Sequence, residues 1–154
     1  MAIQAIRWTR DGTCQVGSNP IRSGQVDVNL AFDGVTPVTR VQVSGRPIEM
    51  VLDSGNQGGT QLWERFAHDF PKLVSGGLKS NRRVTQIGGS VEREVVALPE
   101  VRLRVGGFDA LLQPANIFSK PVGNDLQHGN LGVDVLSQAG EVAIDFRAMS
   151  LTVR

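Results

Sequence analysis

The stretch Ile48-Glu49-Met50-Val51-Leu52-Asp53-Ser54-Gly55-Asn56 decides how this sequence is interpreted. It reads as an apolar strand that runs directly into a carboxylate, a hydroxyl and a glycine. Burying an unpaired carboxylate is costly, so Asp53 either accepts hydrogen bonds from the turn that follows or shares a proton with a second carboxylate. The first role is structural and the second is catalytic. By itself, Asp-Ser-Gly is a common turn tripeptide.

The composition around this stretch describes one compact domain. The chain has 154 residues, 40% of them hydrophobic and 20% charged, which is enough to bury roughly two thirds of the unfolded surface. Sixteen basic and fifteen acidic residues leave a net charge of +1, which argues against nucleic acid or a membrane surface as a partner. No apolar run approaches the ~20 residues that a transmembrane helix needs.

Cysteine and histidine are too scarce for a metal site. Cys14 is the single cysteine and the two histidines are His68 and His128, so an intramolecular disulfide and a zinc site of paired cysteines are excluded. We expect no metal and no organic cofactor, and we expect Cys14 to be a small surface or half-buried residue. The first residues do not resemble a signal peptide. The compartment is not identified: the expectation is cytoplasmic by default, and periplasmic or secreted if the sequence is trimmed from an exported precursor.

Glycine and proline punctuation predicts an all-β fold. Eighteen glycines and seven prolines cut the chain into short apolar pieces. A short helix is expected at 61–70, with Pro71 stopping it, and another at 134–138. Residues 1–24 are expected to form an N-terminal strand and loop, and 25–154 the domain proper. The predicted strands are 26–30, 41–43, 46–52, 83–87, 93–98, 101–105, 141–146 and 150–153.

Four segments in a fixed order resemble the retropepsin-like aspartic protease family, in its bacterial single-domain type. They are the strand into Asp-Ser-Gly, the glycine-rich 87–90, the Leu-Gly-Val-Asp-Val-Leu of 131–136, and the Ile-Asp-Phe of 144–146. The resemblance covers about residues 35 to 154. It implies the acid protease fold, a closed or nearly closed retropepsin-like β-barrel with one or two short helices.

The resemblance also implies roles for particular residues. Asp53 matches the catalytic aspartate, Ser54 the hydroxyl residue that braces two active-site loops against each other, and Gly55 the glycine whose backbone approaches the substrate. Asn56 stands where the family usually has a small residue, and its amide would crowd the substrate or hydrogen-bond to it. The expected flap tip, which closes over a bound peptide, is made by Ile87, Gly88, Gly89 and Ser90.

Further residues are assigned supporting roles. Leu131 and Gly132 match a pair that packs beneath the catalytic loop. Asp134 is interpreted as a helix cap or an ion-pair partner, and both histidines as structural residues. Three basic residues are interpreted as a solvated loop at the base of the flap, namely Lys79, Arg82 and Arg83.

One chain supplies one catalytic aspartate, whereas this chemistry needs two. The resemblance therefore implies a two-fold homodimer, with residues 150–153 and 3–8 as the edges that pair across the axis. It also implies an extended peptide substrate with side chains in apolar subsites. Two alternatives stay open: a non-catalytic peptide-binding or dimerisation barrel, and one lobe of a tandem aspartic protease. A serine hydrolase is disfavoured, because Ser54 lacks the Gly-x-Ser-x-Gly surround.

Overall fold

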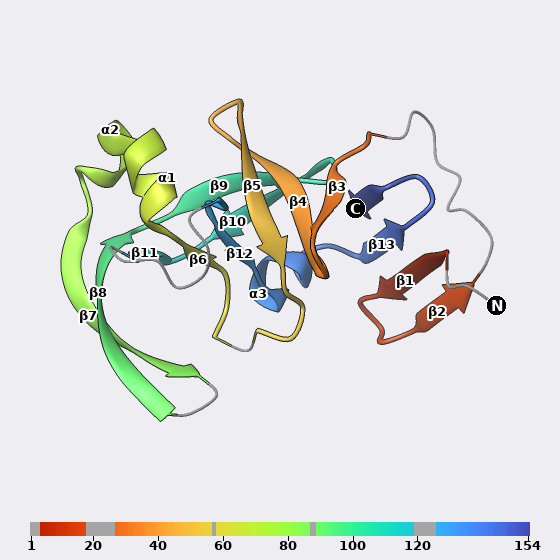
Figure 1. Ribbon diagram of the computed structural model, residues 1–154, viewed down its shortest axis with the longest axis horizontal. Coiled ribbons are helices and arrows are strands. Elements are labelled where there is room, and N and C mark those ends of the chain that lie inside the picture. The colour runs from red at the N-terminus through yellow and green to blue at the C-terminus, as the bar shows by residue number, and fades with distance from the viewer. Residues whose placement is uncertain (1–3, 18–26, 57, 87–88, 119–125) are drawn as a thin grey trace.

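The computed structural model describes residues 4–17, 27–56, 58–86, 89–118 and 126–154, in which strands dominate (Figure 1). None of the helices in these ranges is long and apolar enough to cross a membrane. The helices are α1 (Glu64–Asp69), α2 (Pro71–Val74) and α3 (Val133–Leu136). The strands are β1 (Ala5–Thr9), β2 (Cys14–Gly17), β3 (Leu30–Asp33), β4 (Thr36–Val43), β5 (Arg46–Leu52), β6 (Gln61–Leu62), β7 (Leu78–Gln86), β8 (Gly89–Leu98), β9 (Val101–Val105), β10 (Phe108–Leu112), β11 (Ala115–Phe118), β12 (Gly129–Leu131), β13 (Glu141–Asp145) and β14 (Ser150–Val153).

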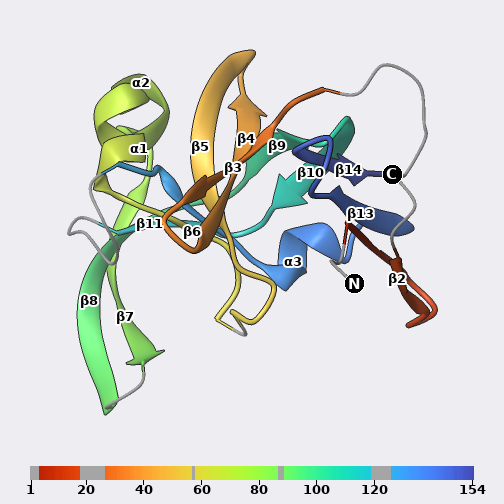
Figure 2. The same ribbon diagram turned by 45° about the vertical axis from the view of Figure 1, so that its right-hand side comes forward.

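Two sheets organise the described strands. The larger has the order β10-β9-β4-β5-β12-β6-β11-β8-β7, with β3 paired to β4, and it curls strongly into a half-barrel. The smaller has the order β14-β13-β1-β2. In both ribbon views the β7–β8 hairpin extends away from the rest of the molecule (Figures 1 and 2). The predicted acid protease fold is confirmed, with a third short helix added.

Strand β9 shows the period-two burial of a strand with one buried face. In β9, Val101, Leu103 and Val105 are buried while the two arginines between them are exposed, because successive side chains of a strand face opposite ways. The predictions for 46–52, 101–105 and 150–153 match the observed bounds. The prediction for 26–30 is wrong, because β3 begins only at Leu30.

The predicted helix at 61–70 begins too early, but it ends where predicted, before Pro71. Gln61 and Leu62 form β6, which pairs with β12, and α1 begins at Glu64. α1 ends at Asp69, with Phe70 as its C-cap, directly before Pro71 as predicted. Pro71 itself begins the separate helix α2, a position where its missing N–H is harmless. The second predicted helix is displaced by one residue at its start and ends earlier, as α3.

The small sheet corrects the predicted dimer edges. β1 pairs with β13 on one side and β2 on the other, so its described residues offer no open edge. The outer edge of β14 is also occupied: Leu151 N–H donates to Asn29 Oδ1, and Leu151 O accepts from Asn29 Nδ2. Val153 N–H donates to Gly106 O. Among the residues that the structure describes, the open edge of this sheet is therefore β2.

A histidine–aspartate pair joins helix α1 to the strand that leads into the Asp53 turn. His128 is buried, and its Nε2 lies 3.1 Å from Asp69 Oδ2 while its Nδ1 accepts the Glu49 N–H at 3.2 Å. Asp69 also contacts the exposed His68. Hydrogen bonds from His68 and then His128 lower the pKa of Asp69 below its usual 3.8.

Replacing Asp69 by alanine should lower the free energy of unfolding by about 1–3 kcal/mol at pH 7, because the buried ring of His128 loses its partner. A carboxylate with a lowered pKa stabilises the fold above its unfolded-state pKa, and this contribution disappears as pH falls through the folded-state value. The difference in the free energy of unfolding between the wild type and Asp69→Ala should therefore shrink below about pH 4. Urea unfolding from pH 3 to pH 7 measures it.

His68→Ala is the matched control, since that ring is exposed and its ion pair should contribute about 0–1 kcal/mol. If Asp69→Ala and His68→Ala lose equal free energies of unfolding, or if the loss in Asp69→Ala does not change with pH, the structural role of the His128–Asp69 pair would be contradicted.

Candidate active site

The Asp53 turn is anchored by the neighbouring strand β12. β5 ends at Leu52, which lies opposite Leu131 of the parallel strand β12. The next N–H, that of Asp53, donates to Leu131 O at 3.0 Å. Leu131 is completely buried. The main chain of Asp53 is thus fixed where it leaves the sheet, and Leu131 lies directly against it.

Asp53 itself is half-buried at the start of this turn. Its Oδ1 accepts the Gly55 N–H at 3.2 Å, and its main-chain oxygen lies 3.3 Å from the Asn56 nitrogen that donates to it. Ser54 and Gly55 are exposed. Among the described residues of this single subunit, nothing hydrogen-bonds to the Ser54 hydroxyl, so its bracing role stays a prediction.

Asn56 organises the loop from within. Its Nδ2 donates to Gly59 O at 3.0 Å and its Oδ1 accepts the Gly58 N–H at 2.9 Å. An asparagine that bonds the main chain two or three residues on is a common way to hold a turn. Both polar ends of the side chain are therefore engaged inside the loop, and its predicted contact with substrate stays untested.

The far end of the loop is fixed by a bridge between Thr60, Asp134 and Gly132. Asp134 Oδ1 accepts both the Thr60 N–H at 2.8 Å and the Thr60 hydroxyl at 2.7 Å. The Thr60 hydroxyl in turn accepts the Gly132 N–H at 2.9 Å. A Cβ on Gly132 would lie 2.9 Å from the main chain of Gly59 and of Thr60, so only glycine fits there.

This bridge corrects the interpretation of Asp134. The carboxylate neither caps α3 nor forms an ion pair in the described residues; it holds the loop. Sequence analysis missed Thr60 altogether, because a single threonine after a glycine pair carries no local signal. Its importance arises from contacts with residues more than seventy positions away.

The predicted flap lies on the β7–β8 hairpin. Its strands pair from Leu78 opposite Ala97 to Gln86 opposite Gly89. Of the four predicted tip residues, Gly89 and Ser90 begin β8, whereas Ile87 and Gly88 lie outside the described residues. The three basic residues interpreted as a loop at the flap base instead belong to strand β7.

A hollow of about 510 Å³ separates the loop from the hairpin. Gly55, Asn56 and Gly58 line one wall, and Arg82, Arg83 and Val84 of β7 line the other. The predicted site residues Gly55 and Asn56 therefore share one concave surface with the hairpin that carries the predicted flap. Such a surface, open to solvent and walled by main-chain groups, suits an extended peptide.

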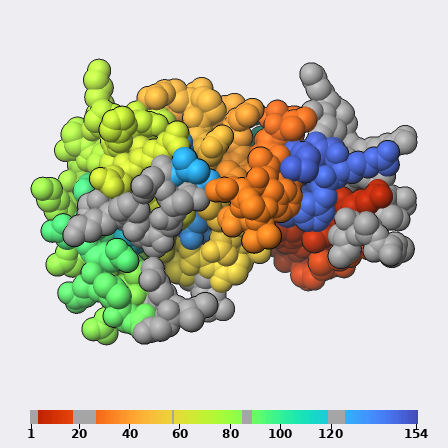
Figure 3. All heavy atoms as spheres, in the orientation of Figure 1, coloured from red at the N-terminus to blue at the C-terminus, as the bar shows by residue number. Residues whose placement is uncertain are grey.

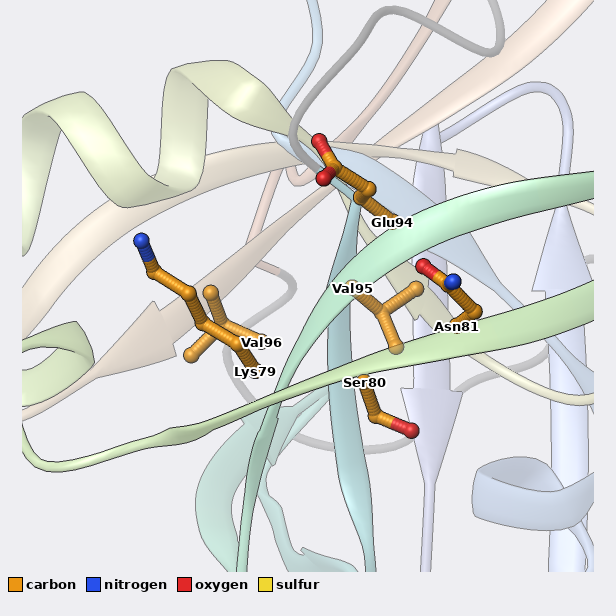
Figure 4. Close-up of a pocket in the computed structure, with 6 residues that line it drawn as sticks. All are labelled: Lys79, Ser80, Asn81, Glu94, Val95 and Val96. Atoms are coloured by element: carbon orange, nitrogen blue, oxygen red, sulfur yellow. The ribbon is translucent and has the colours of Figure 1, made fainter.

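A second hollow of about 300 Å³ lies on the same hairpin and is lined by Lys79, Ser80, Asn81, Glu94, Val95 and Val96 (Figure 4). None of the predicted site residues lines it. We therefore place the candidate active site in the larger hollow, beside the Asp53 turn.

A curled half-barrel that presents an Asp-Ser-Gly turn braced by a Leu-Gly strand end, beside a long hairpin, has the architecture of a retropepsin-like aspartic peptidase. The family model described as aspartyl protease matches residues 39–135, more than half of the chain, and the chain belongs to that family. The match includes the turn, the hairpin and the Leu131-Gly132 segment. No curated protein matches the chain. Membership makes the chain a peptidase, with peptides or proteins as its substrates.

Thr60→Val should lower the free energy of unfolding by about 1–3 kcal/mol, because the Gly132 N–H and one bond of Asp134 lose the hydroxyl in a partly buried setting. Peptidase activity should fall further than stability explains, since the loop that carries Asp53 is no longer held at its far end. Thermal unfolding and a peptide-cleavage assay measure the two effects.

The control is Thr60→Ser, which keeps the hydroxyl and should retain most activity. If valine and serine behave alike, the hydroxyl bridge does not position the loop.

Proposed function

We propose that the chain is an endopeptidase that works as a two-fold homodimer, with Asp53 of each subunit forming one catalytic dyad. Each described chain brings a single Asp-Ser-Gly turn to its hollow. Two carboxylates that share one proton are what the aspartic-protease mechanism requires. The observation that carries the proposal is a half-exposed Asp53 on a loop braced at both ends beside the hollow.

The reaction uses the two carboxyl groups in different protonation states. The ionised Asp53 takes a proton from water as its oxygen attacks the scissile carbonyl carbon, while the protonated Asp53 of the second copy donates to the carbonyl oxygen. The tetrahedral intermediate then collapses, the C–N bond breaks, and the amine leaves with a proton from the dyad. Because the reaction needs one carboxyl group ionised and the other protonated, an acidic or weakly acidic optimum is expected.

The open edge of β2 supports a place for the second copy. Thr9 N–H donates to Thr13 O, which fixes the register of β2 against β1. In an antiparallel pair, alternate residues bond to the partner strand, so Gln15 bonds to β1. The main-chain groups of Cys14 and Val16, on either side of it, therefore point outward. Both side chains are exposed. A two-fold axis through Gln15 would pair Cys14 of each copy with Val16 of the other.

This edge lies on the same side of the molecule as the catalytic loop. In the ribbon and space-filling views, β2, the loop after β5 and the end of the β7–β8 hairpin all reach the lower side (Figures 1 and 3). Joining two copies there would bring the two loops toward a common axis. An exposed strand edge without proline or lysine can also form main-chain hydrogen bonds with a strand of another chain.

Asp53→Asn should reduce peptide cleavage by at least about 10²-fold at every pH between 4 and 7, because the variant has no carboxyl group to accept or donate the proton. The measurement is cleavage of a mixed peptide library, with the fold checked by circular dichroism. Cleavage that survives in Asp53→Asn, or its absence in folded and dimeric wild-type protein, would overturn the proposal.

Val16→Pro removes an outward N–H from β2 without touching the bonds to β1. The dimer dissociation constant should rise by about tenfold or more, equivalent to about 1.4 kcal/mol, and activity at low protein concentration should fall with it. Sedimentation at several concentrations measures the change.

Val16→Thr keeps the main-chain donor and should dimerise normally. An unchanged dissociation constant in Val16→Pro would rule out this edge, and a wild-type chain that stays monomeric and inactive would point to a partner lobe on another chain.

A further inference from the structure

The inner face of the β7–β8 hairpin carries two arginines directly opposite each other. Arg82 of β7 pairs in register with Arg93 of β8, and residues in this relation have Cβ atoms about 5 Å apart on the same face of a sheet. Like charges so placed repel each other unless an anion lies between them.

The alternation of side chains identifies which face this is. Ser80, Arg82 and Val84 share one face of β7, and their partners Val95, Arg93 and Val91 share it on β8. Figure 4 shows Lys79, Asn81 and Glu94 pointing to one side of the hairpin and Ser80 to the other. Val95 is buried and pairs with Phe118 of β11, so the face that holds both arginines is the concave one.

One member of the pair, Arg82, faces the candidate active site, as does the neighbouring Arg83, and Arg93 lies next to Arg82 on the adjacent strand. Arg82 lines the 510 Å³ hollow together with Gly55, Asn56 and Gly58 of the catalytic loop. The half-buried Val84 and the buried Phe118 form an apolar part of the lining of the same hollow. A few fixed polar groups among apolar ones are typical of a ligand subsite.

Neither guanidinium has a carboxylate partner in the part of the chain that the structure describes. The two glutamates of β8 nearest in sequence, Glu92 and Glu94, lie on the outer face by the same alternation. Arg93 is half-buried, and its Nε is buried without a hydrogen-bond partner. An arginine left in this state is poised to bind an incoming acceptor, because its forked donors match a carboxylate.

We propose that Arg82 and Arg93 form a subsite for an acidic side chain of the substrate peptide, Asp or Glu. The inference rests on the proposed peptidase function and departs from the apolar specificity expected from the sequence. The carboxylate would lie between the two guanidinium groups, and its methylene groups against Val84 and Phe118. Binding would relieve the arginine repulsion and satisfy Nε of Arg93.

Paired peptide substrates test the subsite. Peptides that differ only by Glu or Gln at one position, scanned along the sequence, should reveal one position where Glu raises kcat/KM by about tenfold or more. Arg82→Gln, an exposed replacement, should reduce the ratio of kcat/KM for the Glu peptide to that for the Gln peptide towards one. Arg82→Glu should instead favour peptides with Lys at the same position. Arg93→Gln should act in the same direction, with thermal unfolding as a check on its folding.

Lys79→Gln is the matched control, because it removes one positive charge from the same strand on the outer face. It should leave the Glu-to-Gln ratio unchanged. An equal drop in Lys79→Gln and Arg82→Gln would reduce the effect to general charge attraction and overturn the subsite.

Binding without cleavage separates this inference from the proposed function. Fluorescence anisotropy of the same labelled peptides with Asp53→Asn protein should show the Glu preference and its loss on adding Arg82→Gln. Cleavage without a Glu preference would overturn the subsite and leave the peptidase. An Arg82-dependent Glu preference in binding, with no cleavage by the wild type, would support the subsite and overturn the peptidase mechanism.

Discussion

The insertion of β12 between β5 and β6 is the constraint on which the site depends. One side of this short strand runs parallel to β5 and holds the start of the catalytic loop, and the other runs antiparallel to β6, where the loop ends. Glycines make the close approach possible: a Cβ on Gly129 would lie 2.1 Å from Gln61 O, and one on Gly132 would lie 2.9 Å from the main chain of Gly59 and Thr60. Because both ends of the loop bond to the same buried segment, Asp53 is positioned by main-chain contacts that tolerate little movement.

Sequence patterns predicted the parts of this arrangement that depend on local chemistry. The apolar strand before the Asp-Ser-Gly turn and the segment 101–105 were predicted as strands, and the structure has strands there with the expected bounds. Contacts between distant segments were beyond such reasoning. Asp134 looked like a helix cap because it begins a helical turn, yet its partner is Thr60. Asn29 looked like part of a strand, yet its side chain closes the edge of β14. In each case a tertiary partner outweighed the local preference.

The same contacts attach the small sheet firmly to the half-barrel. Asn29 precedes β3, and Gly106 lies in the turn between β9 and β10; both bond to β14. A Cβ on Gly106 would lie 2.7 Å from Leu151 O, so the turn and the strand touch without intervening side chains. The open edge of β2 is consequently held at a fixed place relative to the catalytic loop. Association through that edge therefore requires little rearrangement, which favours affinity because less ordering is left to binding.

The pairing of β1 with β13 also has a consequence for how the protein folds. Ala5 lies opposite Asp145, so this contact closes a loop that contains almost the whole chain, and loop-closure entropy opposes it until the half-barrel has formed. The hairpin β1–β2 should join last during folding and separate first when the native state opens locally. A second subunit that binds β2 would then stabilise the latest-formed part of the fold, which links chain folding and subunit assembly in a single cooperative step.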